Sequence, residues 1–432
     1  MLKRGDKKLI NAWAFYDWAN SVYSLVISTA VFPIYFGVVT KNYETVSFFG
    51  GEFHPLTLYN YALSLSFLIV AFISPILSGI ADYTGNKMKF LKAFCLLGSL
   101  SVMGLFFFKG IDTLWVGIIF TILASIGFWG SIVFYNAYLP EVAFPEQQDK
   151  VSAKGFIYGY TGSVLLLLFN LVMIQKPEWF GFSDASMPSR ITFLLVGIWW
   201  LGFAQITFNR LPNNVYNKEP KKDYVWEGFR ELKKVFHDLV NYPQLKIFLV
   251  SFFLFSVGVQ TIILMAGVFG SNELGLPTSN LIATILLVQI IAILGAYVFS
   301  RLSSKIGNIL TIKITIAIWC VVCFMAFSLD KEQNNVDLYF YGLGGMLGLV
   351  MGAIQSISRS TYSKLLPETE DHATYFSFYD VTEKIAIVLG TFVFGALIAL
   401  TGSMQWSVLF LAVFFLASFI VLSFIKKTKY VS

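Results

Sequence analysis

Long apolar stretches recur along the whole chain, and they restrict its possible folds more than any other feature. All but one of the stretches counted below run for 20 residues or more, and each is long enough for a helix to cross a hydrocarbon core of about 30 Å. Because lipid offers no hydrogen-bond partners, the backbone of such a stretch must satisfy its own polar groups, as a helix does. Only 13% of the residues are charged, against roughly 25% in soluble domains. We therefore expect an all-α, multi-pass membrane protein.

Twelve candidate spans can be counted, in two groups of six on either side of a central polar segment. The expected bounds are 10–38, 57–81, 88–108, 113–136, 151–174, 191–209, 246–270, 278–303, 308–329, 338–363, 375–400 and 404–426. The sequence thus predicts an N-terminal six-helix bundle (1–209), a cytoplasmic linker (210–245) and a C-terminal six-helix bundle (246–432).

The linker contains a candidate surface helix. Val225, Phe229, Leu232 and Phe236 recur at helical spacing, with Trp226 beside them, while basic residues occupy other positions. This pattern is typical of an amphipathic helix that lies on an anionic membrane surface. We interpret the segment as a linker with a surface helix, and a regulatory or partner-binding role is the alternative.

The distribution of basic residues predicts the orientation in the membrane. Of the 31 Lys and Arg residues, 25 lie at the termini, in the even-numbered loops or at the adjoining span ends. The odd-numbered loops hold only Lys41, Lys109, Lys176, Arg190 and Lys331. Because cytoplasmic loops carry the excess of Lys and Arg, both termini are expected in the cytoplasm, and the membrane would be the inner one in a bacterium. The net charge of +6 is explained by topology, and no nucleic-acid partner is expected.

The two groups of spans show the signs of an internal repeat. "LSGIADYTGNKMK" (77–89) follows the second span and "FSRLSSKIGNILT" (299–311) follows the eighth, with Gly-Asn at the same offset. "YNAYLPE" (135–141) after the fourth span is echoed by "YSKLLPE" (362–368) after the tenth. Two parallel repeats of six helices indicate a transporter with its substrate site between the halves.

The first of these loops resembles the cytoplasmic signature of the major facilitator superfamily. The matching positions are Gly79, Asp82, Gly85, Lys87 and Lys89, with Asn86 where a basic residue is more usual. Further stretches, including "AWAFYDWANSVYS", "GFIYGYTGS", "GVQTIILMAGVFG" and "YFSFYDVTEKIA", resemble the fungal autophagy-related vacuolar effluxers and their bacterial relatives. The resemblance implies the major facilitator fold and a monomeric secondary transporter that works by alternating access. It also implies a small, polar, amino-acid-like solute, because the fungal members are associated with amino-acid release.

The resemblance also implies how the first loop acts. In the facilitator pattern, the loop acid (here Asp82) docks near the N-terminus of the eleventh span, around Tyr375, when the cytoplasmic side is shut. The helix end favours an anion there. The corresponding position after the eighth span is Ser304, which is uncharged. We therefore expect only the first half to carry this contact, with Gly79, Gly85 and Lys87 supporting it and Lys87 and Lys89 meeting neighbouring acids.

The first span holds a polar stripe. Asp17, Asn20, Ser24 and Ser28 lie on one helical face, and charge at membrane depth marks a functional candidate. We expect the stripe to line the substrate or proton pathway. The alternative is that Asp17 only pairs with the basic N-terminal segment.

The eleventh span carries Asp380, Glu383 and Lys384 close together. Asp380 and Lys384 are spaced for a local ion pair, which leaves Glu383 without an evident partner. A carboxylate in a low-dielectric site can hold and release a proton near neutral pH, so we expect protons as the coupling ion. The alternative is that these residues only close a gate.

Other polar residues inside the spans are candidates of lower specificity. Arg359 either forms a gating pair with Asp17 or Asp380, or binds a substrate carboxylate. Gln355 lies one turn before Arg359, and Gln260 and Gln289 lie in the middle of their spans. Each glutamine either meets the solute or bonds to a neighbouring helix.

Other kinds of chemistry find little support. Cys320 and Cys323 form a C-x-x-C inside an apolar helix, and the histidines all fall in loops, so no metal, cofactor or catalytic residue is expected. No phosphate-binding loop for ATP is present. A sugar, nucleoside or drug porter of the same fold is the alternative to an amino-acid-like substrate. A non-transporting membrane enzyme or structural protein is the alternative of a different class.

Overall fold

The computed structural model describes residues 3–213, 216, 218 and 224–426, without the side chains of 224, 225 and 240. Val225, placed on the apolar face of the linker helix, therefore lies outside the described side chains. The twelve expected spans are confirmed as helices within a few residues of their expected bounds, except that the fourth and fifth continue about six residues towards each other, to Val142 and from Pro145.

The N-terminal half contains six of these spans and a small hairpin. Its main elements are α1 (Lys7–Val22), η1 (Tyr23–Val31), α2 (Phe32–Thr40), β1 (Val46–Phe48), β2 (Gly51–Phe53), α3 (Pro55–Thr84), α4 (Lys87–Gly104), α5 (Leu114–Ala137), α6 (Leu139–Val142), α7 (Gln148–Gln175) and α8 (Ser186–Phe208). The π-helix η1 joins α1 and α2 into the first span. This hairpin, formed by β1 and β2, was not predicted from the sequence.

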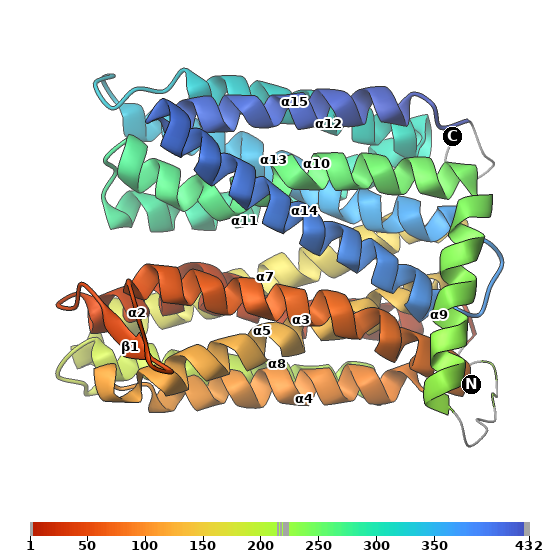
Figure 1. The fold of residues 1–432 in the computed structure, drawn as a ribbon, viewed down its shortest axis with the longest axis horizontal. Helices are drawn as coiled ribbons and strands as arrows, with labels where there is room; N and C mark the ends of the chain where they lie inside the picture. The colour runs from red at the N-terminus through yellow and green to blue at the C-terminus, as the bar shows by residue number, and fades with distance from the viewer. Residues whose placement is uncertain (1–2, 214–215, 217, 219–223, 427–432) are drawn as a thin grey trace.

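The linker helix and the C-terminal half follow. Their elements are α9 (Tyr224–Asn241), α10 (Pro243–Val268), η6 (Phe269–Glu273), α11 (Thr278–Ile306), α12 (Asn308–Phe327), α13 (Val336–Leu365), α14 (His372–Thr401) and α15 (Met404–Leu422). Figure 1 shows two bundles side by side, joined by α9. We call the end with both termini and α9 the terminal face, and the opposite end, with β1 and β2, the hairpin face.

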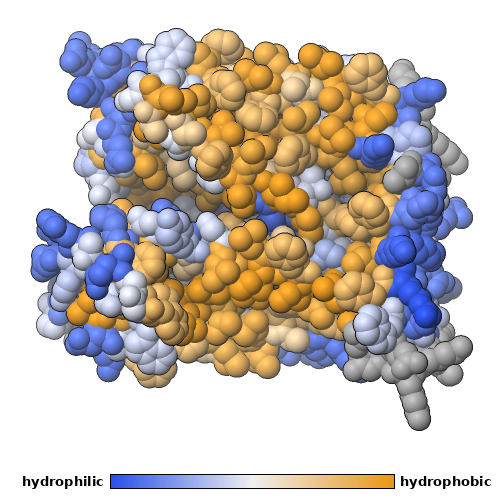
Figure 2. Space-filling model, viewed as in Figure 1, coloured by the Kyte–Doolittle hydropathy of each residue, from blue (hydrophilic) through white to orange (hydrophobic). Residues whose placement is uncertain are grey.

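On the side that Figure 2 shows, the surface of both bundles is largely apolar along the spans, and hydrophilic residues gather at the two faces. Figure 2 also shows a furrow between the halves, with hydrophilic side chains within it. This distribution is the one expected of helices whose outer sides contact lipid.

Helix α9 crosses the ends of both bundles at the terminal face (Figure 1). It packs on the last turns of α3, where a Cβ at Gly79 would collide with the backbone carbonyl of Gly228. Within α9, Val235 is buried, whereas Trp226, Phe229 and Phe236 are exposed. The helix thus has a protein-facing side and an apolar exposed side, and Gly79 provides the space for its close approach.

Candidate functional site

An ion pair between the halves lies at the centre of the candidate site. Nη2 of Arg359 (α13) lies 3.2 Å from Oδ2 of Asp17 (α1), and each side chain is only 5% exposed. The Tyr135 hydroxyl donates a 2.8 Å hydrogen bond to the same carboxylate oxygen. Among the described residues, Asp17 therefore pairs with Arg359 across the halves, and the alternative pairing with the basic N-terminal segment is wrong.

The Arg359 guanidinium makes five hydrogen bonds, as many as it has N–H groups. It donates twice to Asp17, at 3.2 and 3.3 Å, once to Asn136 Oδ1 at 3.2 Å, and to the hydroxyl and carbonyl of Ser152 at 3.0 and 2.8 Å. All these acceptors belong to the N-terminal half. Removing one partner of such a buried pair typically costs roughly 3–5 kcal/mol. The network therefore favours the arrangement in which the halves meet here.

Three glycines of α7 allow this pair to form. A Cβ at Gly155 would collide with the Asp17 carboxylate, and one at Gly162 would crowd the Trp18 ring. Gly159, between them, likewise faces α1. These glycines bring α7 and α1 close together at the level of Asp17. Their spacing in "GFIYGYTGS" was visible in the sequence, but their packing role was not inferred from it.

The polar stripe of the first span does not form one uniformly wet face. Asp17 and Asn20 are buried, whereas Ser24 is exposed. Nδ2 of Asn20 has no hydrogen-bond partner among the described residues. The helix becomes the π-helix η1 at Tyr23, so the 3.6-residue spacing that defined the stripe ends there. A pathway role for Asn20 and Ser24 stays a prediction.

A second charged cluster joins α14, α10 and α5. Lys384 Nζ lies 3.0 Å from Asp380 Oδ1, 3.4 Å from Glu383 Oε2 and 3.5 Å from the ring centroid of Trp129. Gln260 donates a 2.7 Å hydrogen bond to Glu383 Oε1. The local pair of Asp380 with Lys384 is present as expected. The expectation that Glu383 lacks a partner is wrong, because α10 brings Gln260 to it.

This cluster places one cation beside two carboxylates within the span. The Lys384 and Asp380 side chains are 1% and 3% exposed, while that of Glu383 is 17% exposed. Oδ2 of Asp380 has no partner among the described residues. Glu383 is therefore the more accessible of the two carboxylates to water or solute. Within the described part of the chain, no group of three His, Cys, Asp or Glu is placed to hold a metal ion.

The other two glutamines differ in their surroundings. Gln355 Oε1 accepts a 2.7 Å hydrogen bond from the Tyr160 hydroxyl, which links α13 to α7 across the halves. Gln289 on α11 is half-buried and makes no side-chain hydrogen bond with a described residue. Gln355 thus belongs to the contact between the halves, and Gln289 has a free amide.

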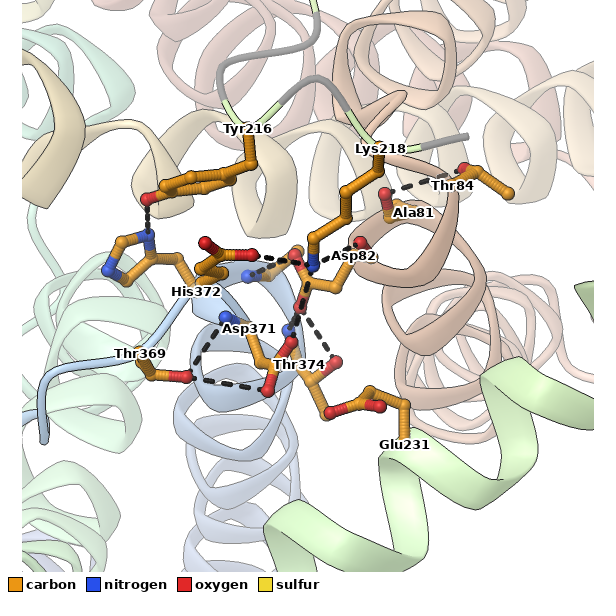
Figure 3. Close-up of polar contacts among 12 residues, drawn as sticks. Ala81, Asp82, Thr84, Tyr216, Lys218, Glu231, Thr369, Asp371, His372 and Thr374 are labelled. Carbon is orange, nitrogen blue, oxygen red and sulfur yellow. Dashed lines mark hydrogen bonds and ion pairs between the residues drawn. The ribbon is translucent and has the colours of Figure 1, made fainter. Parts of the chain in front are cut away.

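Asp82 lies at the N-terminus of α14, as expected from the facilitator pattern (Figure 3). Its carboxylate accepts hydrogen bonds from the backbone N–H groups of Ala373 and Thr374, at 3.2 and 2.6 Å, and from the Thr374 hydroxyl at 2.8 Å. The N–H groups of a first helical turn lack partners within the helix, and the helix dipole favours an anion there. We call this contact between the halves the Asp82 latch.

The linker reinforces the Asp82 latch. Lys218 donates to the Asp82 carbonyl at 2.9 Å and lies 3.8 Å from Asp371 (Figure 3). Lys234 of α9 lies 3.1 Å from the other carboxylate oxygen of Asp371. Burial raises the pKa of Asp371, but a hydrogen bond with Glu231 and the charges of Lys234 and Lys218 outweigh burial and lower that pKa. Asp371 therefore keeps its charge down to a lower pH, and the linker contacts both halves.

The loop after α3 has the conformation that its glycine requires. Gly85 has φ +67°, in the left-handed region, and ends α3. Lys87 forms an ion pair with Glu141, and His372 Nδ1 lies 3.1 Å from the same carboxylate across the halves. Lys89 is exposed and forms no ion pair with the described residues, so the expectation that it meets a neighbouring acid is wrong.

A second contact between the halves resembles the Asp82 latch, but here the donors come from the C-terminal half and accompany an acid on a span of the N-terminal half. Asp149, at the N-terminal end of α7, accepts hydrogen bonds from Ser303 Oγ at 2.9 Å and Asn308 Nδ2 at 2.8 Å, and pairs with Lys364 at 2.8 Å. Here α7 supplies the acid, and the ends of α11, α12 and α13 supply the donors. Ser304 is exposed and bonds only within its own helix. The expectation of a single latch is therefore wrong, because it rested on the uncharged Ser304, whereas the acid of the second contact is Asp149 on α7.

We predict that each latch stabilises closure at the terminal face. Asp82→Asn or Asp149→Asn removes a charge worth roughly 1 kcal/mol from the closed state, so the closed-to-open ratio should fall about fivefold. In the double variant the closed-to-open ratio should fall about 25-fold, since the free-energy effects of distant contacts add. The measurement is the labelling rate of Cys introduced at Ser356, which is buried between the halves, in a background without native cysteines.

A Cys at exposed Ser304 serves as the control and should label equally in every variant. If Asp149→Asn leaves labelling at position 356 unchanged while Asp82→Asn raises it, the second contact is not a latch. If neither changes labelling, both interpretations fail.

Comparisons with known proteins agree with this architecture. The family described as "Vacuole effluxer Atg22 like" matches residues 5–430. The uncharacterized MFS-type transporter YxiO of Bacillus subtilis is 31% identical over 418 residues, covering 96% of this chain and 93% of the relative. Autophagy-related protein 22-1 of Penicillium rubens is 23% identical, covering 88% of this chain and 77% of that protein.

Solved structures show the same fold. A proton:xylose symporter of the major facilitator superfamily superposes with a TM-score of 0.74 at 14% identity, covering 98% of this chain and 97% of that chain. The transporter FucP in its outward conformation gives a TM-score of 0.71 at 13% identity, covering 98% of both chains. The chain therefore belongs to the "Vacuole effluxer Atg22 like" family, within the major facilitator superfamily of transporters.

Proposed function

We propose that this transporter moves a small, polar, amino-acid-like solute by alternating access, driven by protons, with both termini in the cytoplasm. One observation carries the mechanism: the Asp17–Arg359 pair is buried between the halves, with Arg359 of the C-terminal half bonded to Asp17, Asn136 and Ser152 of the N-terminal half. When the halves separate at the terminal face, both charges enter a water-filled cavity. The pair can therefore separate without leaving either charge in contact with lipid, because water hydrates both charges in the open state.

The conformation described here is closed at the terminal face. The Asp17–Arg359 pair and both latches hold the halves together there, and the basic residues predict that this face is cytoplasmic. In the proposed cycle, this state is open toward the opposite side of the membrane. Breaking the pair and the latches then gives the state open to the cytoplasm.

The second charged cluster supports the choice of solute. Lys384 offers a positive charge and Glu383 a partly exposed negative charge, with Gln260 beside them. A zwitterion presents the complementary pair, a carboxylate for Lys384 and an ammonium for Glu383. The effluxer family description favours an efflux direction. A sugar carries no charge that could pair with either group.

Glu383 is the proposed proton carrier. It lies within a span, has 17% of its side chain exposed, and is held by Lys384 and Gln260. Protonation would neutralise the Glu383 carboxylate, so the proton and the ammonium group of the solute would compete for the same carboxylate. This competition is one way to couple proton movement to solute movement.

We predict that Asp17→Asn reduces transport at least tenfold without lowering the yield of folded protein. The substitution keeps the shape but leaves the Arg359 charge without its counter-ion in the closed state. Uptake of a mixture of radiolabelled amino acids into proteoliposomes measures the effect. Asp112→Asn, at an exposed site on the hairpin face, is the matched control and should transport normally. Full transport by the Asp17 variant would exclude the proposed role.

We predict that Glu383→Gln abolishes accumulation driven by a pH gradient but preserves exchange of labelled for unlabelled solute. The amide keeps the hydrogen-bonding shape and cannot carry a proton. Both assays use the same proteoliposomes, with exposed Glu178→Gln as the control. Survival of both activities would place the proton carrier elsewhere, and loss of exchange with folded protein would show that the Glu383 charge serves solute binding and not proton coupling alone.

A further inference from the structure

A groove on the outside of the C-terminal half lies apart from the site between the halves. It has a volume of about 440 Å³ and is formed by α9, α10 and α14. Its walls include Phe236 of α9, Val250 and Phe253 of α10, and Phe378 and Ile385 of α14. Because Val250 and Ile385 are 46% and 52% exposed on membrane-spanning helices, the groove opens toward lipid.

The groove has one charged end and one apolar end. Lys246 lies in the first turn of α10 at the terminal face, while Phe253 lies seven residues further along, or about 10 Å deeper at 1.5 Å per residue. Phe378 and Ile385 follow the same direction along α14, which also starts at this face. The groove therefore runs from the membrane surface into the hydrocarbon.

The charge at the surface end is uncompensated by the protein. Lys246 is exposed, and its ammonium forms no hydrogen bond or ion pair with the described residues. Exposed Lys233 of α9 adds positive charge on the same face. Lysines at the cytoplasmic surface attract anionic lipid headgroups.

We propose that this groove binds an anionic phospholipid, with its phosphate at Lys246 and one acyl chain along Val250, Phe253 and Ile385. A lipid chain fits because the groove faces hydrocarbon, where neither water nor a polar ligand competes. The bound lipid also contacts both α9 and α14, which already meet through Phe236 and Phe378 at 6.0 Å between ring centroids. It would hold the linker helix beside the Asp82 latch.

The test uses phosphatidylglycerol and phosphatidylcholine probes with a photoactivatable group on the acyl chain. Each is reconstituted with the full-length protein, and cross-linked peptides are quantified by mass spectrometry. The phosphatidylglycerol probe should label residues 250–253 or 382–385 at least threefold more than other lipid-exposed helices. The phosphatidylcholine probe should show no such preference.

Two variants make the result specific. Lys246→Glu should abolish the preference for phosphatidylglycerol, while Lys305→Glu, at an exposed lysine on the end of α11, should keep it. Val250→Trp should lower labelling of the groove by both probes, because the ring fills the path of the chain. Equal labelling of all outer helices by phosphatidylglycerol, or an unchanged preference in Lys246→Glu, would overturn the proposal.

Discussion

The cost of placing charges within a membrane governs the rest of this structure. Charged side chains at membrane depth cost at least a few kcal/mol each unless they are paired or reach water. Asp17 and Arg359 meet this requirement together, with Arg359 making five hydrogen bonds to the opposite half. The same pair therefore both satisfies its own charges and holds the halves together. Glycines on α7 are needed because a Cβ at Gly155 would occupy the space of the carboxylate.

Elsewhere on the terminal face, charges are also satisfied across the halves, here at the ends of helices. Asp82 caps α14 from the first half, and Asp149, on α7, is met by donors from the second. The two contacts are related by the internal repeat but exchange the roles of acid and donor. The linker contributes Lys218 and Lys234 to the same region, so separation of the halves also requires the linker to release Asp371.

Much of this could be predicted from the sequence because it rests on local patterns. The lengths of the apolar stretches predicted the twelve helices, and the resemblance of the first loop to the facilitator signature implied the position of Asp82 at the start of α14. The contact of Asp149 with the C-terminal half was not predicted, because Asp149 lies in the first turn of a helix, where a carboxylate is common for other reasons. The hydrogen bond between Gln260 and Glu383 was not predicted, because the two residues lie 123 positions apart in the sequence. The π-helix η1 could not be inferred, since a small change in backbone spacing leaves no mark in composition.

The central claim is that charged contacts at the terminal face control which side of the transporter is open. Distances between spin labels test it most directly, with one pair at exposed Lys89 and Lys305 on the terminal face and one at Glu178 and Lys331 on the hairpin face. In proteoliposomes, Arg359→Gln should lengthen the first distance and shorten the second relative to the wild type. Unchanged distance distributions at both faces would contradict the account.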